Sequence, residues 1–296
     1  MTDETPALPD DQLQIVLAAR PVGVPQASDF RAVRGPVPTP ADGEVLVRSA
    51  YLSLDPAMRG WMTDRKSYLP PVPLDGVMRG LVLGEVVASR DDRFAVGDAV
   101  SGVVGWQEYG VLPGDQLDRV PGGVRPEEAM GPLGMTGLTA YFGLFDVGAP
   151  KAGETVLVSA AAGAVGSIVG QLAKIHGCRV VGTAGSDAKC AWLVDELGFD
   201  AAVNYRDADG TAKGVDGLQT ELNAACPKGV DVYFDNVGGD LLDAALRLLR
   251  RRGRLGVVLR DRAAQHDAAA TPQHAQRGVE QIAADVVEVD VDALRA

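Results

Sequence analysis

The sequence contains few of the residues that build disulfide frameworks or metal centres. Only three cysteines and three histidines occur among its 296 residues. Cys178, Cys190 and Cys226 include no close pair, which excludes a disulfide framework and the spacing of a zinc finger. We therefore expect no bound metal ion.

Long apolar runs are missing as well. No stretch of about 18 apolar residues occurs, so we expect no transmembrane helix. Residues 1–12 are acidic and lack the apolar centre of a signal peptide. These absences predict a soluble, cytoplasmic protein.

Positive charge is scarce relative to negative charge. The chain has 28 Lys and Arg residues against 40 Asp and Glu, a formal net charge of −12. Such a surface repels nucleic-acid phosphates and anionic lipid, so we expect neither partner. A neutral small-molecule substrate fits this surface better, and an anionic cofactor would need a local pocket of donors.

The first part of the chain, residues 1–126, is predicted to be a β-rich domain. Strands are expected at residues 44–52, 80–88 and 99–104, separated by turn-forming proline and glycine. The spacing predicts a small, irregular all-β domain or barrel.

The pattern changes to alternating strands and helices over residues 127–259. A helix is expected at 126–148 with a break near Gly134. Further strands are predicted at 155–159, 179–183, 201–205 and 230–235, and further helices at 164–176, 187–197 and 240–251. This alternation is typical of an α/β domain with a parallel sheet.

A glycine-rich bend follows the strand at 155–159. Gly163 would let the backbone approach a diphosphate, and Gly166 would let the next helix pack close to the strand. The free N–H groups at the helix start would bind phosphate; the expected contacts are Ala162, Gly163, Ala164, Val165 and Gly166. The alternative is a tight turn that is merely rich in glycine. The flanking strands and helix favour a nicotinamide-dinucleotide site in a doubly wound Rossmann sheet.

The end of the second strand indicates which dinucleotide binds. An NAD site places a carboxylate at this point, whereas here Gly185 and Ser186 follow the strand, with Lys189 one turn into the helix. Ser186 can also cap that helix. These residues predict a 2′-phosphate contact and hence NADP(H). Two alternatives stay open: Asp187 accepts the ribose hydroxyl, or it is a first-turn acid and Lys189 is simply solvated.

Several segments resemble the zinc-independent medium-chain reductases, in particular the leukotriene B4 dehydrogenase, prostaglandin reductase and curcumin-reductase-like group. The most specific are YLSLDPAMRG at 51–60 and GMTGLTAY at 134–141. Residues 20–30, 182–189 and 235–239 match as well, and the similarity extends from about residue 12 to about residue 255.

The resemblance implies a GroES-like catalytic domain, a Rossmann domain and NADPH-dependent reduction of the C=C bond of α,β-unsaturated ketones or aldehydes. It implies that Tyr205 joins Ser186 and Lys189 at the cofactor. It also implies that Met135, Thr136, Asn236 and Val237 lie near the nicotinamide. Leu83-Gly84-Glu85 stands where a zinc-dependent relative would have a Gly-His-Glu-type setting.

Four side chains are candidates for the catalytic site: Tyr51, Arg59, Tyr68 and Thr136. Each also has a structural interpretation. Tyr51 continues an apolar strand, Arg59 is spaced to pair with Asp55, Tyr68 lies beside prolines, and Thr136 can bond within its own helix. In the reaction implied, donors would stabilise the enolate oxygen and a tyrosine or water would protonate the α-carbon.

The tail at 260–296 differs from the rest of the chain. It has no aromatic residue and weak periodicity, and it lacks the loop and long helix with which relatives continue. We hypothesise a frameshift near residues 255–260 that leaves the tail atypical or disordered. Two alternatives to an enone reductase therefore stay open: a quinone reductase, or an NADP(H)-binding protein with impaired catalysis. A homodimer also stays open.

Overall fold

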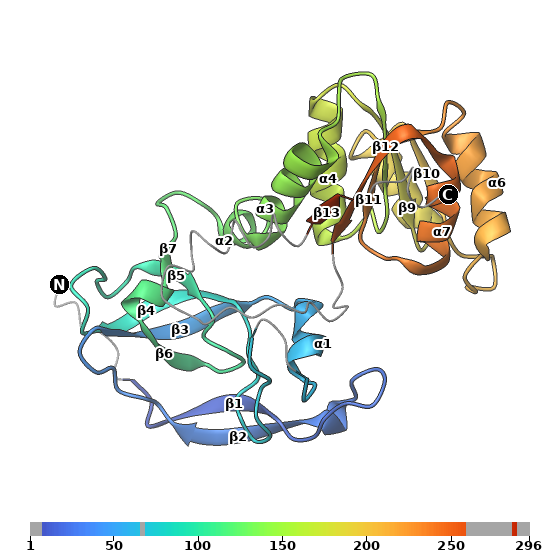
Figure 1. Cartoon of the computed structure of the whole chain (residues 1–296). Coiled ribbons are helices and arrows are strands. Elements are labelled where there is room, and N and C mark those ends of the chain that lie inside the picture. The colour runs from blue at the N-terminus through green and yellow to red at the C-terminus, as the bar shows by residue number, and fades with distance from the viewer. Residues whose placement is uncertain (1–7, 66–68, 259–285, 289–296) are drawn as a thin grey trace. The chain divides into compact units, whose positions relative to one another are not determined.

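The computed structural model describes residues 8–65, 69–258 and 286–288 (Figure 1). The described chain divides into two compact units, the first ending at Met130 and the second beginning at Gly131. The prediction that residues 1–126 and 127–259 are separate domains stays a prediction. Within the described ranges, no helix is both long enough and apolar enough to span a bilayer.

The first unit is built from antiparallel strands. A hairpin joins β1 (Asp11–Leu17) to β2 (Phe30–Pro36), and a second sheet has the order β6-β3-β4-β5-β7. Its strands are β3 (Glu44–Leu52), β4 (Val82–Ser89), β5 (Ala99–Gly102), β6 (Tyr109–Pro113) and β7 (Asp118–Arg119). Short helices are α1 (Ala57–Trp61), α2 (Pro126–Met130) and the 3₁₀ turns Ala27–Asp29 and Gly114–Gln116. The three predicted strands are confirmed within a few residues.

Valines on alternating positions form the core of this sheet. Val45 and Val47 of β3 pack with Val82 and Val86 of β4, and all four are almost completely buried. Gly84 is required between them, because a Cβ there would lie 2.3 Å from the Arg48 carbonyl oxygen. The period of two therefore produces the predicted β domain.

The second unit contains a six-stranded sheet with the order β10-β9-β8-β11-β12-β13. Its strands are β8 (Thr155–Val158), β9 (Arg179–Ala184), β10 (Ala201–Asn204), β11 (Val230–Asp235), β12 (Leu249–Val258) and β13 (Val286–Glu288). The first five run parallel, and β13 is antiparallel to β12. This is the predicted doubly wound arrangement.

Helices pack on the sheet of this unit (Figure 1). They are α3 (Met135–Phe142), a π-helical turn (Gly143–Gly148), α4 (Ala164–Ile175), α5 (Asp187–Asp195), α6 (Val215–Ala225) and α7 (Gly239–Leu248). The predicted break near Gly134 is confirmed. Helix α6 was not predicted, although Val215, Leu218 and Leu222 have helical spacing and pack into the core.

Both faces of the parallel sheet are buried. Leu157 and Tyr233 point into a cluster with α6 and α7, whereas Val156, Val158 and Phe234 point into a cluster with α4. Strands covered on both sides read as continuous apolar runs, as TVLV at 155–158 does.

The structure describes only three residues of the segment 260–296 that the sequence predicts to be atypical. Residues 286–288 form β13, which pairs with Gly256, Val257 and Val258 of β12. The remainder of the predicted atypical segment, 260–285 and 289–296, lies outside the described residues. The hypothesis of a frameshift or disorder there stays a prediction.

Candidate dinucleotide site

The order of the parallel strands reverses between β8 and β11. Ligands of doubly wound sheets bind at such a switch point, beyond the carboxyl ends of the strands. The glycine-rich bend follows β8, and the loop Asp235–Gly239 follows β11. The candidate site therefore combines two segments that are about 75 residues apart in sequence.

The bend after β8 folds back on itself. Ala160 has φ of +45°, and its carbonyl oxygen accepts from the Gly163 N–H at 2.8 Å. A Cβ at Gly166 would lie 2.5 Å from the Ala160 oxygen and 2.8 Å from the Ala161 Cα. Because both neighbours are backbone atoms, only glycine lets α4 approach this closely, as the sequence predicted.

The start of α4 presents unused backbone donors. Gly163 is the N-cap and no side chain caps this end. The first-turn N–H groups of Ala164, Val165 and Gly166 have no acceptor inside the helix, and Ala162 immediately precedes the cap. Such an N-terminus suits a phosphate, since the donors and the helix dipole both favour negative charge.

A buried aspartate joins the second loop to the bend. Asp235 is 1% exposed, and its Oδ1 accepts from the Ser159 hydroxyl at 2.9 Å and the Tyr233 hydroxyl at 2.8 Å. The N–H groups of Val237 and Gly238 donate to the same oxygen at 3.0 and 3.1 Å. Burial and the neighbouring aspartate raise the pKa of Tyr233 well above its usual value, so its hydroxyl stays a donor.

Ser159 completes this connection. Its hydroxyl oxygen accepts from the Asn236 N–H at 2.6 Å, and its carbonyl oxygen accepts from the Asn236 side-chain amide at 2.8 Å. The side-chain oxygen of Asn236 and the side chain of Val237, which is 43% exposed, remain at the carboxyl edge. Three hydrogen bonds thus join the loop after β11 to Ser159, just before the bend. Three more, all to Asp235 Oδ1, order the loop itself.

The end of β9 carries the predicted 2′-phosphate residues. Ser186 is the N-cap of α5, and its hydroxyl accepts from the Lys189 N–H at 3.3 Å, which confirms the predicted cap. Lys189 itself is exposed. The Tyr205 hydroxyl lies over Gly185, since a Cβ there would come within 2.7 Å of it. Gly185, Ser186 and Tyr205 therefore lie together.

A cavity of about 460 Å³ opens beside these residues. Gly185, Ser186, Asn204 and Arg206 contribute to its lining. Asp187 also lines it, but its Oδ1 accepts from the Asn204 side-chain amide at 2.8 Å. Its Oδ2 accepts no bond from the described residues, so the alternative role of Asp187 as a ribose acceptor stays open.

Arg206 is a residue that the sequence interpretation missed. Its guanidinium carbon lies 5.5 Å from the centre of the Tyr205 ring, and Nη1 donates to the Gly210 carbonyl at 2.7 Å. The available signal was a cation directly after the third parallel strand. It brings positive charge to the same cavity as Ser186.

Met135 and Thr136 begin α3 in the second unit. Met135 is 46% exposed, whereas the Thr136 hydroxyl donates to the Gly131 carbonyl at 3.0 Å. This local bond is the alternative expected for Thr136, and it leaves the hydroxyl oxygen as an acceptor. A Cβ at Gly137 would lie 1.9 Å from the Pro132 oxygen, so glycine lets α3 close against the turn before it.

The other catalytic candidates belong to the first unit. Tyr51, at the end of β3, is 46% exposed, so the interpretation of Tyr51 as a core residue is wrong. Arg59 does not pair with Asp55, which instead accepts from the Ser53 hydroxyl at 3.0 Å. Its guanidinium donates to the Pro21 and Gly23 carbonyls at 3.0 to 3.2 Å. Tyr68 lies outside the described residues.

Two family models match the chain. The first, described as the N-terminal domain of an oxidoreductase, covers residues 13–120. The second, described as a zinc-binding dehydrogenase, covers residues 164–267. The chain belongs to the zinc-independent medium-chain dehydrogenase/reductase family.

Relatives with similar sequences place it within that family. The chain is 53% identical over 247 residues to a putative NADP-dependent oxidoreductase, YfmJ, of Bacillus subtilis, covering 83% of this chain and 70% of that one. It is 46% identical over 245 residues to the NADPH-dependent curcumin reductase of Escherichia coli, covering 82% and 68%. A solved structure of CurA from Vibrio vulnificus in complex with NADPH is 42% identical, with a TM-score of 0.76 over 92% of this chain and 80% of that one.

The name of the second family model refers to zinc. Among residues 8–65, 69–258 and 286–288, no group of three His, Cys, Asp or Glu side chains could hold a metal ion. Cys178, Cys190 and Cys226 are free thiols. Burial raises the pKa of each, that of Cys226 to about 11. These cysteines are therefore poor nucleophiles and poor metal ligands at neutral pH.

Proposed function

We propose that the chain is an NADPH-dependent reductase that transfers a hydride to the C=C bond of α,β-unsaturated ketones or aldehydes. One observation carries the proposal: backbone donors at the start of α4 lie at the switch point of a family whose members use NADP(H). Curcumin, the substrate named for the Escherichia coli relative, has C=C bonds conjugated to carbonyl groups.

The bend would hold the diphosphate of the cofactor. The uncapped N–H groups of Ala164, Val165 and Gly166 would donate to its oxygens, together with that of Ala162. The Gly163 N–H already donates to the Ala160 carbonyl oxygen, so the role left to Gly163 is to let the backbone approach the diphosphate. Since Gly166 already contacts the backbone of Ala160, the bend is preorganised and does not have to close on the ligand.

The cavity beside β9 would hold the 2′-phosphate. Ser186, Lys189 and Tyr205 would contact it, and we add Arg206, whose guanidinium lies against the Tyr205 ring. The NADP-dependent relatives and the NADPH complex of the similar structure support NADPH over NADH. The cluster supplies donors for a phosphate, and the acidic residues Asp187, Asp207 and Glu221 line the same cavity.

The loop after β11 would position the nicotinamide end. Asn236 and Val237 are fixed by Asp235 and Ser159, and Met135 and Thr136 are proposed as further contacts. When bound, NADPH supplies the hydride. Residues of the chain orient the ring, and a donor must stabilise the developing enolate oxygen.

The candidates for the proton transfer differ in exposure and in the hydrogen bonds that their side chains already make. Nε and Nη2 of Arg59 donate to two backbone carbonyls of the loop at 21–23, whereas its Nη1 is buried without a partner among the described residues. Tyr51 is exposed, and its hydroxyl has no hydrogen-bond partner among the described residues, so it is the better candidate. Tyr68 remains a candidate on sequence grounds alone.

The test is NADPH oxidation by the full chain with a panel of enones and enals, each paired with its saturated analogue. We expect turnover of the unsaturated member and none of the saturated one. Turnover of a quinone but of no enone would favour the quinone-reductase alternative. Saturable NADPH binding without turnover of either would favour the impaired alternative.

A chain with a different C-terminal segment tests whether a lack of turnover is caused by the tail. Replacing residues 256–296 by a relative's C-terminal segment should restore turnover if the tail alone is at fault. The cytoplasmic location, a small-molecule partner and a homodimer stay predictions of the same proposal.

A further inference from the structure

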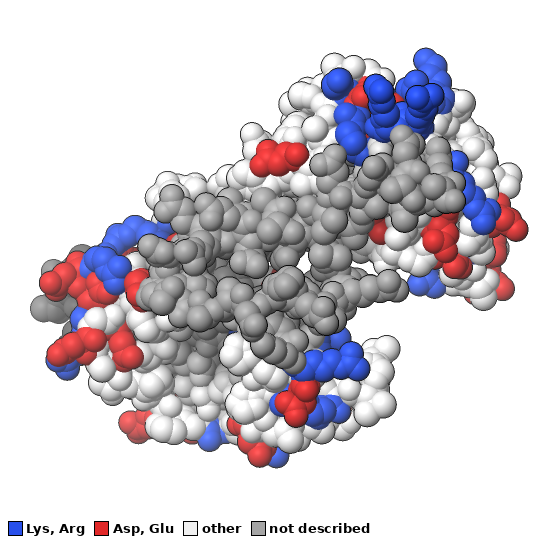
Figure 2. All heavy atoms as spheres, in the orientation of Figure 1, with Lys and Arg blue, Asp and Glu red and all other residues white. Residues whose placement is uncertain are grey.

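The amino-terminal edge of the parallel sheet carries a concentration of positive charge. Figure 2 shows Lys and Arg side chains gathered over one end of the second unit. Four arginines occur within the stretch 250–254, and they line a cavity of about 340 Å³ with Lys151; the full set of cations is Lys151, Arg250, Arg251, Arg252 and Arg254. This is unexpected in a chain of net charge −12.

The backbone brings these arginines to one place. In a regular strand, successive side chains point to opposite faces. Here the register of β11 with β12 shifts between Val230 and Val232, and Arg252 has φ of +64°. A left-handed residue other than glycine costs about 1 kcal/mol and often marks a functional site. The irregularity turns Arg250, Arg251 and Arg252 toward the same cavity as Arg254.

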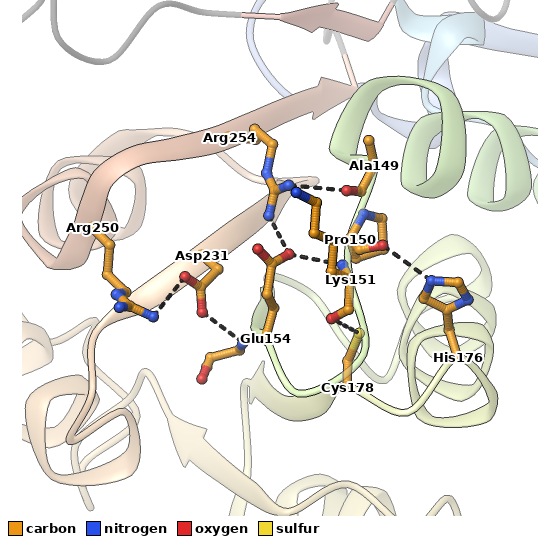
Figure 3. A network of polar contacts seen from close by, with 10 residues as sticks. Ala149, Pro150, Lys151, Glu154, His176, Cys178, Asp231, Arg250 and Arg254 are labelled. Atoms are coloured by element: carbon orange, nitrogen blue, oxygen red, sulfur yellow. Dashed lines mark hydrogen bonds and ion pairs between the residues drawn. The ribbon is translucent and has the colours of Figure 1, made fainter.

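Only part of this charge is neutralised within the unit. Arg250 pairs with Asp231 at 2.9 Å, and Arg254 pairs with Glu154 and donates to the Ala149 carbonyl at 2.9 Å (Figure 3). Both carboxylates have a second role, since Asp231 accepts from the Thr155 N–H and Glu154 from the Lys151 N–H. Five cations against two carboxylates leave a formal excess of three positive charges around the cavity.

The remaining cations are available for a ligand. Lys151, Arg251 and Arg252 are exposed, and none of their side-chain nitrogens has a partner among the described residues. Arg250 and Arg254 are held in place by their carboxylates, so two guanidinium groups are fixed and three cations surround them. This arrangement is preorganised for an acceptor with several negative oxygens.

We propose that this cavity is a second anion site, which binds a ligand with consecutive phosphate groups. Guanidinium groups match phosphate oxygens with two parallel hydrogen bonds, whereas a single carboxylate would use only one of the five cations. A chain of phosphates can contact Arg251, Arg252 and Lys151 together. A free polyphosphate and the triphosphate of a nucleotide share this chemistry.

The site is separate from the dinucleotide bend. Gly153 and Glu154 lie before β8, and the bend begins after it. The four residues of β8 span about 13 Å at the usual rise of a strand. NADPH and the second anion should therefore bind at the same time, without competition.

The experiment is calorimetric titration of the full chain with inorganic triphosphate, at constant ionic strength. The test variant is Arg251→Gln with Arg252→Gly, which removes two unpaired cations and relieves the left-handed residue. The matched control is Arg247→Gln, which removes one exposed arginine of α7 outside the cavity. Each protein is also titrated with NADPH.

We expect one triphosphate per chain, about tenfold or more weaker binding by the double variant, and no change for the control. NADPH affinity should be unchanged in all three proteins. Equal binding of ATP and triphosphate would identify the phosphates alone as the ligand, and tighter binding of ATP would indicate a nucleotide; either result supports the site.

Three results would overturn the proposal. One is the absence of saturable triphosphate binding by the unmodified chain. Another is displacement of triphosphate by NADPH, which would place it at the bend of α4. The third is binding of an oligoglutamate peptide without binding of triphosphate, which would make the cavity a protein-docking surface. None of these results would affect the NADPH-dependent reaction proposed above.

Discussion

The two edges of the parallel sheet offer different groups to a negatively charged ligand. At the carboxyl edge, the bend at 160–167 offers backbone N–H groups and contains no charged side chain. At the amino edge, five cationic side chains surround a cavity. The first arrangement depends on glycine, which lets the backbone of α4 approach that of Ala160 closely. The second depends on cationic side chains that the irregular register of β11 with β12 brings together.

This difference predicts how each edge responds to substitution. A site made of backbone donors loses its affinity when the chain cannot adopt the required conformation. A site made of cationic side chains loses affinity stepwise as individual cations are removed. The carboxyl edge should also depend less on salt than the amino edge, because exposed charges are screened. Substitutions at the carboxyl edge follow from the largest expected effect to the smallest, and an alkaline titration of the core of the same unit stands between them.

The largest effect is expected from Gly166→Val. The added side chain would meet the Ala160 oxygen and the Ala161 Cα, so α4 must move away from β8. We expect at least a hundredfold loss of NADPH affinity, together with destabilisation of about 3 kcal/mol. Fluorescence titration and denaturant unfolding measure the two effects.

A matched control keeps this result interpretable. Gly214→Ala changes the glycine N-cap of α6, where nothing lies within 4 Å of an added Cβ. It should leave NADPH affinity and stability almost unchanged. Triphosphate binding by folded Gly166→Val at unchanged affinity would further show that the two edges are independent; its loss in the folded variant would contradict the comparison.

The next effect concerns the buried hub of the carboxyl edge. Asp235→Asn keeps the size of the side chain but weakens four hydrogen bonds to the carboxylate oxygen. We expect a loss of about 2 kcal/mol in stability and a higher KM for NADPH. Tyr233→Phe removes one of the four donors and should cost about half as much; an equal or larger loss would argue against Asp235 as the hub.

Alkaline pH tests the core cluster between the sheet and helices α6 and α7, in which Cys226 is buried. Burial raises the pKa of Cys226 from the usual 9.0 to about 11, so the folded chain holds this proton after the unfolded chain has lost it. Stability from this group is therefore complete below pH 9 and is lost as the pH rises through 11. The loss amounts to about 3 kcal/mol.

The measurement compares the unmodified chain with Cys226→Ala by denaturant unfolding at several pH values. Relative to the variant, the unmodified chain should lose stability only above pH 9. Parallel curves across that range would show that Cys226 ionises equally in both states, which would contradict its buried position.

The smallest effect is expected at the 2′-phosphate. Lys189→Ala should weaken NADPH about tenfold and leave NADH unchanged, because only NADPH has the additional phosphate. Arg206→Gln should act in the same direction. Lys174→Gln, which removes a cation that pairs with Asp200 at 2.9 Å, is the control. Equal losses for both cofactors would remove Lys189 from the 2′-phosphate site.

The sequence predicted those features that depend on local patterns. The continuous apolar strands, the Ser186 cap and the close approach at Gly166 all follow from neighbouring residues. Side-chain environments set by distant segments were not accessible. Ile175 and Val194 have the spacing of buried helix positions but are 84% and 38% exposed, because the strands and helices that would cover them lie elsewhere.

The parts of the site that escaped prediction depend on pairing across the sheet. Asp235 was recognised within a motif, but its bond to Ser159 joins residues 76 apart in sequence. Arg206 enters the cavity because β10 lies beside β9. Arg250 and Arg251 were predicted as the end of the helix at 240–251, and only the register shift between β11 and β12 places them around one cavity with Arg254.

The most direct test of the account is hydrogen exchange at the bend, followed by mass spectrometry with and without NADPH. We expect the amides of Ala162, Ala164, Val165 and Gly166 to become protected on binding, since they would donate to the cofactor's phosphates, whereas the Gly163 amide already donates to Ala160. Saturable NADPH binding with unchanged exchange in that segment would contradict the claim that the backbone of this bend holds the dinucleotide.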